Sequence, residues 1–259
     1  MRTTVFFNMK GGTGKTISCI NVACELAARG KRVVVVDADP QRNLTHFYMP
    51  KEIDPFNLYD VISGHFGIND IPGILVPCTE NISLIPGSMD LILADIRALQ
   101  RKLINLNTFR ELAEVLAEDD AADFMLIDSP PSFTAATTAA LAGADDVIIP
   151  IRLDAFSLAG VGELLRQIAG MHEINQRLRV AGALVTQYDG TTVARETADA
   201  LRESAVPIFG TTIRRSTVVD RSTFERKPLR EMQGNYAKIL AEEYAAVVDE
   251  YLRGGARNG

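Results

Sequence analysis

The fold of this 259-residue chain is decided by one segment, Met9-Lys10-Gly11-Gly12-Thr13-Gly14-Lys15-Thr16. A short apolar run over Thr4–Asn8 precedes it and predicts a β-strand, and the pattern over Lys15–Arg29 predicts a helix. A glycine-rich turn between a strand and a helix is the setting of a phosphate-binding loop. Glycines let backbone N–H groups converge on phosphate oxygens, and the following helix presents its positive end to them. The segment therefore predicts a nucleotide site.

Two side chains of the loop carry the expected phosphate chemistry. Lys15 is expected to reach the β- and γ-phosphates of ATP, and the Thr16 hydroxyl is expected to ligate Mg²⁺. Met9 stands where the ordinary motif has its first glycine, and Lys10 adds a second lysine at the mouth of the loop. The residues predicted to bind the nucleotide here are Lys10, Gly11, Gly12, Thr13, Gly14, Lys15, Thr16 and Ile17.

Aspartates end two further strand-like runs, Arg32–Asp37 and Phe124–Asp128. In a parallel sheet the carboxyl ends of the strands face the ligand crevice. Asp128 therefore fits a carboxylate that faces the metal, usually through a water molecule. On the residues alone, Asp37 and Asp39 could also be simple turn formers before Pro40, and the phosphate loop upstream makes this alternative the weaker one.

Strand-like and helical segments alternate along nearly the whole chain, which indicates an α/β fold. We expect the three-layer P-loop NTPase architecture, in which helices cover both faces of a mostly parallel sheet. The other predicted strands are Ile82–Ile85, Asp146–Ile151 and Val180–Gln187. The other predicted helices are Met89–Ala117, Thr134–Ala142, Leu158–Asn175, Val193–Ser204 and Asn235–Leu252. We expect a single domain over residues 1–253, an irregular stretch at Met49–Pro86, and a disordered tail over residues 254–259.

The composition argues against several classes of function. The net charge is −6, from 27 Lys and Arg against 33 Asp and Glu. This charge argues against a protein whose whole surface is basic and binds nucleic acid. The cysteines Cys19, Cys24 and Cys78 form no CxxC pair, so neither a disulfide framework nor a zinc site is indicated. No apolar run approaches the roughly 20 residues that span a bilayer. A cytoplasmic protein is therefore expected.

The loop sequence K-G-G-T-G-K-T resembles that of the deviant Walker, or ParA/MinD-type, ATPases. In that family the lysine at the position of Lys10 crosses to the nucleotide of a partner subunit, as an arginine finger does. The segment Asp37-Ala38-Asp39-Pro40-Gln41 resembles the first switch of the family, and Asp128-Ser129-Pro130-Pro131 resembles the second. The resemblance implies that Asp39 orients the attacking water and that Asp37 lies in the outer coordination sphere of Mg²⁺. It thus implies catalytic roles for Lys10, Lys15 and Asp39, and a metal site at Thr16, Asp37 and Asp128.

The resemblance extends through three later segments, Val147–Gly160, Val180–Asp189 and Ile213–Leu229. It implies an adenine site between the end of a late strand and the loop after the next one, formed by Gln187, Arg214 and Ser216. The chain departs from the family pattern at Arg214, where a proline is usual, and at Thr191-Thr192-Val193, where Arg-Thr-Asn is usual.

The segment between Ile213 and Arg230 is rich in basic residues, with six lysines and arginines and only two acidic residues. ParA-type proteins present their DNA-binding face here. The resemblance implies DNA contacts by Arg215, Arg221, Arg226, Lys227 and Arg230. The charge pattern alone is also that of a solvated surface, and Val218 stands where many relatives carry an arginine.

Taken together with the resemblance, which is nearest to the Soj-like ParA proteins, these features predict a partitioning ATPase. We expect a homodimer that forms on ATP, binds double-stranded DNA non-specifically at the nucleoid, and hydrolyses ATP slowly when a ParB-like or other adaptor protein stimulates it. A MinD-like positioning ATPase and an ATP-dependent biosynthetic enzyme, such as an amide ligase, are alternatives on the same fold. The last predicted helix is acidic, so an anionic membrane would repel it and no membrane partner is expected. A protein like the nitrogenase iron protein is disfavoured, because no cysteine lies near Asp128.

Overall fold

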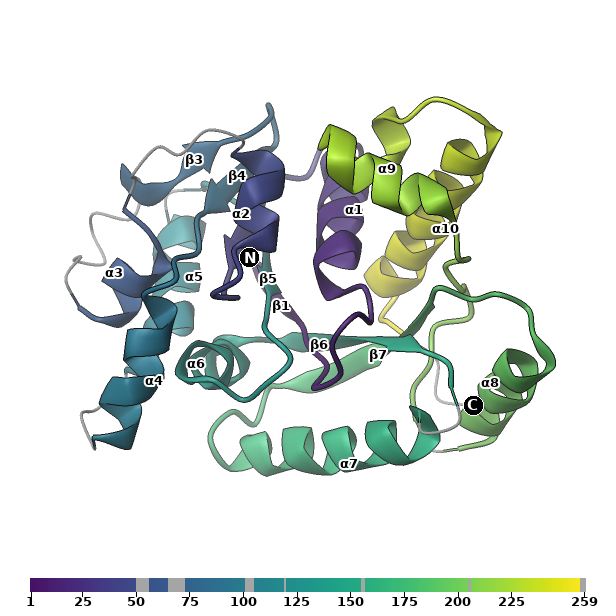
Figure 1. Ribbon diagram of the computed structural model, residues 1–259. Coiled ribbons are helices and arrows are strands. Elements are labelled where there is room, and N and C mark those ends of the chain that lie inside the picture. Colours follow the sequence, from purple (N-terminus) through teal and green to yellow (C-terminus); the bar gives the residue numbers. More distant parts are fainter. Residues whose placement is uncertain are drawn as a thin grey trace.

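The computed structural model describes residues 1–49, 56–64, 73–100, 105–118, 120–154, 157–204 and 206–256. Its centre is a seven-stranded sheet in the order β3-β4-β2-β5-β1-β6-β7 (Figure 1). β3 is antiparallel to β4, and the other neighbouring strands are parallel. The strands are β1 (Arg2–Phe6), β2 (Val33–Asp37), β3 (Val76–Pro77), β4 (Ile82–Ile85), β5 (Phe124–Asp128), β6 (Asp146–Arg152) and β7 (Arg179–Thr186). The predicted α/β class with a mostly parallel sheet is confirmed.

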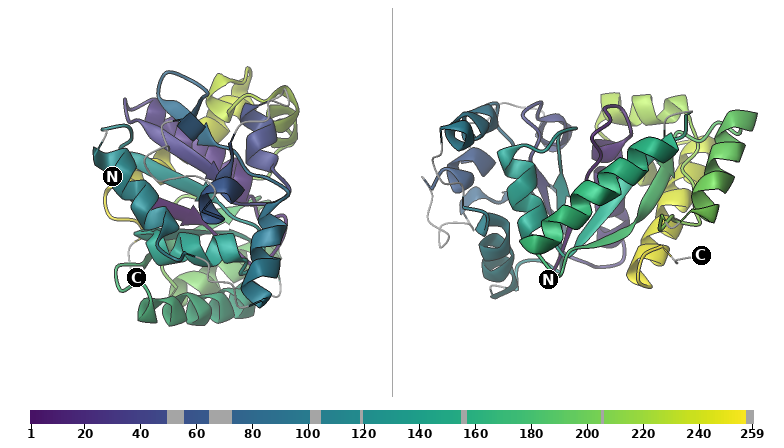
Figure 2. Two further views of the ribbon diagram at one scale, coloured as in Figure 1. Left: turned by 90° about the vertical axis from the view of Figure 1, so that its left-hand side faces the viewer. Right: turned by 90° about the horizontal axis from the view of Figure 1, so that it is seen from below.

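Helices cover both faces of this sheet (Figures 1 and 2). The first face packs against α1 (Lys15–Ala27), α2 (Asn43–Tyr48) and α10 (Asn235–Leu252). The second face packs against α3 (Leu58–Ile62), α4 (Leu91–Leu99), α5 (Thr108–Glu118), α6 (Ala135–Gly143), α7 (Ser157–Gly170) and α8 (Thr192–Glu203). The remaining helical elements are α9 (Thr217–Glu225) and the short 3₁₀ turns η2 (Met171–Glu173) and η3 (Leu229–Glu231).

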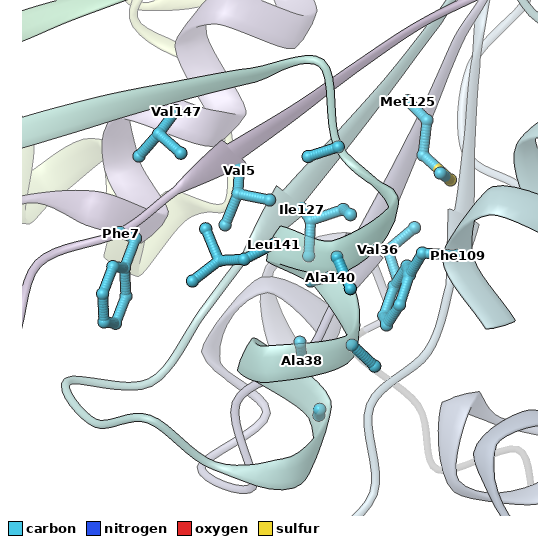
Figure 3. Packing of buried hydrophobic residues seen from close by; sticks show 14 of the residues in the cluster. Val5, Phe7, Val36, Ala38, Phe109, Met125, Ile127, Ala140, Leu141 and Val147 are labelled. Atoms are coloured by element: carbon cyan, nitrogen blue, oxygen red, sulfur yellow. The ribbon is translucent and has the colours of Figure 1, made fainter. Parts of the chain in front are cut away.

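Strand side chains alternate between the two apolar layers. In β1, Val5 packs into the layer of the second face and Phe6 into that of the first. Figure 3 shows the second-face layer, in which Val5, Ile127 and Val147 of three strands lie near Leu141 of α6. Because both sides of each central strand are covered, the strands read as continuous apolar runs in the sequence.

The structure differs from the sequence-based prediction mainly at short helices and at one long helix that is interrupted. The predicted helix Met89–Ala117 is divided into α4 and α5, and a turn at Asn105 precedes α5. The Oδ1 atom of Asn105 accepts from the Asn107 N–H at 2.9 Å, and its carbonyl accepts from the Thr108 N–H at 3.2 Å. Three helices, α2, α3 and α9, were not predicted from the sequence. A capping box at Asn57 begins α3 inside the stretch expected to be irregular.

The strand order brings three connecting segments to one edge of the sheet. β5 lies between β2 and β1, and the register places Asp128 beside both Asp37 and Phe6. The phosphate loop follows β1 at this same edge. The fold therefore gathers the carboxylates predicted to lie near the metal at the base of the predicted phosphate site.

The C-terminal residues that the structure describes contact β7. The Ala256 N–H donates to the Ala181 carbonyl at 2.6 Å. Residues 257–259 of the expected tail lie outside the described residues, so the division at residue 253 stays a prediction. In the described part of the chain, no helix combines the length and the apolar character needed to cross a membrane.

Candidate functional site

The phosphate loop borders a cavity of about 430 Å³. Gly12 and Gly14 adopt φ values of 71° and 83°, a region that favours glycine. A Cβ atom built on Gly11 or Gly12 would meet nothing within 4 Å, so the backbone there is open to a ligand. The cavity is lined by residues 11–17 together with Asp39, Gln41, Asn43, Pro131 and Gln187.

Lys15 begins α1 and is only 8% exposed. Its Nζ atom donates to the carbonyl oxygens of Asn8 at 3.2 Å and of Lys10 at 3.3 Å. Burial lowers the pKa of Lys15, and the carboxylates of Asp128 and Asp39 oppose that shift. An ammonium held by neutral carbonyls beside an open cavity is well placed to bind an anion.

Asp37 and Asp128 lie side by side in the parallel ladder, and both are fully buried. The Oδ2 atom of Asp37 accepts from the N–H and the hydroxyl of Thr45, each at 2.7 Å. Burial raises the pKa of Asp37 to about 6, with the Asp39 charge adding to the shift and the Thr45 bonds opposing it. Burial also raises the pKa of Asp128 well above its usual value, and the charge of Asp37 adds to this, whereas the Thr16 side chain acts in the opposite direction.

Neither carboxylate oxygen of Asp128 has a hydrogen-bond partner among the described residues. A buried, unpaired carboxylate near the Thr16 hydroxyl fits a hard cation such as Mg²⁺, which binds through oxygen atoms and keeps several of its waters. The described residues hold no cluster of three or more His, Cys, Asp or Glu side chains suited to a metal ion. The Asp128 carboxylate and the Thr16 hydroxyl therefore suit a cation that also binds phosphate and water. They would not by themselves enclose a metal ion in protein ligands.

Asp39 adds a third carboxylate at this edge. Its backbone N–H donates to Asp37 Oδ1 at 3.2 Å, and its own Oδ1 accepts from the Gln41 N–H at 2.8 Å. Asp39 is 9% exposed and lines the phosphate cavity. The structure thus brings Lys15, Asp39 and Asp128 together from three separate segments.

Lys10 lies outside this group. Its Nζ atom forms an ion pair with Asp154, which follows β6, and the two side chains are 48% and 33% exposed. The Lys10 N–H donates to Asn8 Oδ1 at 2.9 Å. Lys10 lines a separate hollow of about 410 Å³ with Met9 and Ile151 rather than the phosphate cavity of its own chain.

A second cavity of about 540 Å³ adjoins the loop at Gly14 and Ile17. The predicted adenine residues Gln187, Arg214 and Ser216 all line it. Two backbone hydrogen bonds of Tyr188 join its walls: the Tyr188 N–H donates to the carbonyl of Ile213, and the Tyr188 carbonyl accepts from the N–H of Arg215, both at 2.9 Å. The sequence analysis missed two further lining residues, Tyr236 and Tyr244 of α10.

Acidic neighbours neutralise much of the basic segment between Ile213 and Arg230. These ion pairs are Arg214 with Glu243 at 2.5 Å, Arg221 and Lys227 with Glu225 at 3.6 Å, and Arg230 with buried Glu25 at 3.0 Å. Within the described part of the chain, no ion pair involves Arg215 or Arg226. The five predicted DNA contacts are all exposed. Arg215 and Arg226 lie outside these ion pairs, although the charge of Arg215 helps to lower the pKa of nearby Asp189.

Comparison with known proteins identifies the family. Residues 1–180 match the protein family described as an AAA domain. A chromosome-partitioning ATPase Soj from Thermus thermophilus is 33% identical over 258 residues, which cover 96% of this chain and 98% of that protein. The chain belongs to the ParA/Soj family of P-loop ATPases. A second Soj of that family, from Treponema pallidum, is 35% identical over 193 residues, covering 74% of this chain and 73% of that protein.

Solved structures share the ParA/Soj fold. Cobyrinic acid a,c-diamide synthase from Mycobacterium smegmatis, with a bound ATP analog and magnesium, has a TM-score of 0.77 and 29% identity. The matched region covers 98% of this chain and 95% of the synthase chain. A Cyanothece McdA–ATP complex has a TM-score of 0.81 and 22% identity, with coverages of 98% and 96%. At this level of identity, the similarity to McdA shows a shared fold and carries no conclusion about function.

Asp37 and Asp128 make the stability of the nucleotide-free protein depend on pH. Folding raises the pKa of Asp37 from 3.8 to about 6, so its stabilising contribution is present at about pH 4 and is lost as the pH rises through 6. Burial raises the pKa of Asp128 as well, so its contribution changes with pH in the same direction. We expect Asp128→Asn to raise the midpoint of thermal unfolding at about pH 8 and to change it little at about pH 4.

Asp123→Asn is the matched control, because hydrogen bonds from Arg32 hold the pKa of Asp123 below its usual value. Its contribution is present above the unfolded pKa and is lost as the pH falls, so this variant is expected to be destabilised at about pH 8. Thermal unfolding followed by circular dichroism measures both variants. Destabilisation of both at about pH 8 would contradict the conclusion that burial raises the pKa of Asp128.

Proposed function

We propose that this chain is a ParA-type partitioning ATPase, which hydrolyses ATP between two copies of itself and binds double-stranded DNA without sequence preference. The observation that carries the proposal is the position of Lys10. Its ammonium contacts Asp154 at the surface, while Lys15 serves the phosphate cavity of the same chain. A half-exposed cation beside, but outside, its own cavity is suited to reach the nucleotide of a second copy. The Soj and ParA relatives support the same function.

The loop supports ATP as the substrate. Backbone N–H groups of residues 11–16 and the ammonium of Lys15 would bind the phosphates, and the cavity at Gln187 and Ser216 would take the base. Thr16 and Asp128 would hold Mg²⁺ directly or through water, with Asp37 behind them. Mg²⁺ neutralises negative charge on the β- and γ-phosphates during phosphoryl transfer.

Asp39 is the residue placed to orient the attacking water. One carboxylate oxygen accepts from the Gln41 N–H, which fixes the group against the edge of the cavity. The second oxygen would accept a hydrogen bond from the water. Lys10 of the partner copy would bring positive charge to the transferring phosphoryl group, and a ParB-like or other adaptor would accelerate this slow step. DNA binding would place the dimer on the nucleoid, in the cytoplasm.

A biosynthetic synthase is the second candidate. The 29% identity to a cobyrinic acid a,c-diamide synthase favours it, as does the hollow of about 410 Å³ beside Lys10, where an acceptor carboxylate could lie near Arg152. ATP turnover that responds to a small carboxylic acid and not to DNA would favour this candidate. The MinD-like candidate is disfavoured, because Glu242, Glu243 and Asp249 make α10 acidic.

Lys15→Ala is expected to lower the affinity for ATP with Mg²⁺ by at least about a hundredfold, because the buried ammonium beside the cavity is removed. Lys31→Ala is the control, since Lys31 is an exposed lysine just beyond α1. Isothermal titration calorimetry measures both. Equal affinities for the two variants would place the nucleotide elsewhere.

Asp39→Ala is expected to bind ATP and to dimerise but to lose turnover, because only the group that orients water is removed. Lys10→Ala is expected to weaken the ATP-dependent dimer as well as turnover, since the cation supplied to the partner is absent. Size-exclusion chromatography with light scattering, together with phosphate release, separates the two effects. Normal ATP hydrolysis by Lys10→Ala would rule out a role for this lysine in the partner site.

The double variant Arg215→Glu with Arg226→Glu is expected to lose ATP-dependent DNA binding at about 50 mM salt while the dimer still forms. Each lost phosphate contact reduces the salt slope of binding by about one unit. Arg177→Glu with Arg202→Glu makes the same change in net charge on other exposed elements and is the control. Fluorescence anisotropy with two unrelated duplexes measures the affinity. Loss of binding in both double variants would show a net-charge effect rather than a local contact surface.

A further inference from the structure

The end of β7 holds the phosphate loop through two consecutive side chains. The Thr186 hydroxyl donates to the Thr13 carbonyl at 2.7 Å, and the Ile151 carbonyl lies 3.1 Å from the same hydroxyl. Thr186 is 2% exposed, so this bond is shielded from water. The Nε2 atom of Gln187 donates to the Gly12 carbonyl at 2.7 Å, in an exposed position.

These bonds fix two peptide planes of the loop. In a planar trans peptide, the carbonyl of one residue and the N–H of the next point in opposite directions. Because the carbonyls of Gly12 and Thr13 point to β7, the N–H groups of Thr13 and Gly14 point away from it. Both bonds join protein groups alone, so the orientation they give the loop does not require a phosphate.

Thr186 also packs directly against the backbone of the phosphate loop at Gly14. A Cβ atom built on Gly14 would lie 3.6 Å from both Oγ1 and Cγ2 of Thr186, so the loop backbone rests directly on this side chain. The next residue but one, Tyr188, is hydrogen-bonded through its backbone to Ile213 and Arg215 at the base cavity. One short segment, residues 186–188, thus holds both the phosphate loop and the wall of the base cavity.

We propose that Thr186 is a positioning residue that sets the phosphate loop for ATP before the nucleotide arrives. Its hydroxyl acts through the loop carbonyl, which directs the N–H of Gly14 toward the phosphates. The proposal rests on ATP being the substrate. A loop that already has the binding orientation does not spend part of the ATP-binding free energy on ordering. Loss of the Thr186 hydroxyl would add this cost and so lower the affinity for ATP.

Three variants separate this role from simple packing. Thr186→Val keeps the shape and removes the donor, which leaves the Thr13 carbonyl buried and unpaired, and it is expected to lower the affinity for ATP with Mg²⁺ by about tenfold or more. Thr186→Ser keeps the hydroxyl and is expected to stay within about threefold of the parent. Thr138→Val is the matched control, because it removes a hydroxyl that donates to the Thr134 carbonyl at 2.8 Å and Thr138 lines neither nucleotide cavity; it is expected to leave the affinity for ATP unchanged.

Calorimetric affinities are compared with the thermal unfolding midpoints of the nucleotide-free variants. Hydrogen exchange of the Gly14 amide in the nucleotide-free protein reports the loop orientation directly, and it is expected to change in Thr186→Val and not in Thr186→Ser. A merely structural threonine would lower the unfolding midpoint of Thr186→Val and leave its ATP affinity unchanged. That result overturns the proposal, as does a Thr186→Ser protein as weak as Thr186→Val. Thr186→Ala, which also lacks the hydroxyl, supplies the same comparison where the valine variant fails to fold.

The outcomes for this proposal and for the ATPase function are distinguishable. A parent protein that does not bind ATP overturns both. A parent that binds ATP, with a folded Thr186→Val variant that binds it equally well, overturns the positioning role alone.

Discussion

The burial of Asp37 beside Asp128 is the constraint on which the rest of the site depends. The parallel ladder between β2 and β5 places the two carboxylates side by side, out of water, where each disfavours the ionisation of the other. Thr45 satisfies one oxygen of Asp37, but Asp128 has no hydrogen-bond partner among the described residues. A buried carboxylate without a hydrogen-bond partner, such as Asp128, is typical of a functional site, because stability alone would favour a neutral side chain at that position. A cation bound at this edge would offset the repulsion between the two carboxylates and so would couple folding to ligand binding at this point.

Around this fixed centre, the two lysines of the loop are held in opposite ways. The loop and Lys15 are held by buried bonds from Asn8 and Thr186, which water cannot easily replace. Lys10 is held by an exposed ion pair with Asp154, and such pairs contribute only about 0–1 kcal/mol. The part of the site that binds phosphate in one chain is therefore fixed. The part proposed to reach a second chain can change its partner at little cost.

The sequence was informative where chemistry and local structure coincide. The phosphate loop lies between a strand and a helix as predicted, α10 has the predicted bounds Asn235–Leu252, and Lys15, Asp39 and Asp128 meet at one edge. Short elements such as α2 and α9 were missed, because their stability comes from packing rather than from an extended periodic pattern. Contacts between distant residues could not be predicted. Thr186 and Thr13 are 173 positions apart, and Arg230 and Glu25 are 205 apart, so no local pattern relates them.

The second of these distant pairs changes the interpretation of the basic segment. Arg230 contacts Glu25 of α1, and the neighbouring Leu229 N–H donates to Asn21 of the same helix at 2.8 Å. The segment is thus attached to the helix that begins at Lys15, and the ion pair reduces the positive charge that would remain for DNA. Of the predicted DNA contacts, only Arg215 and Arg226 lie outside ion pairs of the described residues, and the net charge is −6, so one copy would offer few phosphate contacts against a general repulsion. Two copies held side by side double those contacts within one binding event, and the second set then acts at high effective concentration. If the chain binds DNA as proposed, internal neutralisation of the segment would make that binding depend more strongly on dimerisation than a fully exposed cluster of six basic residues would.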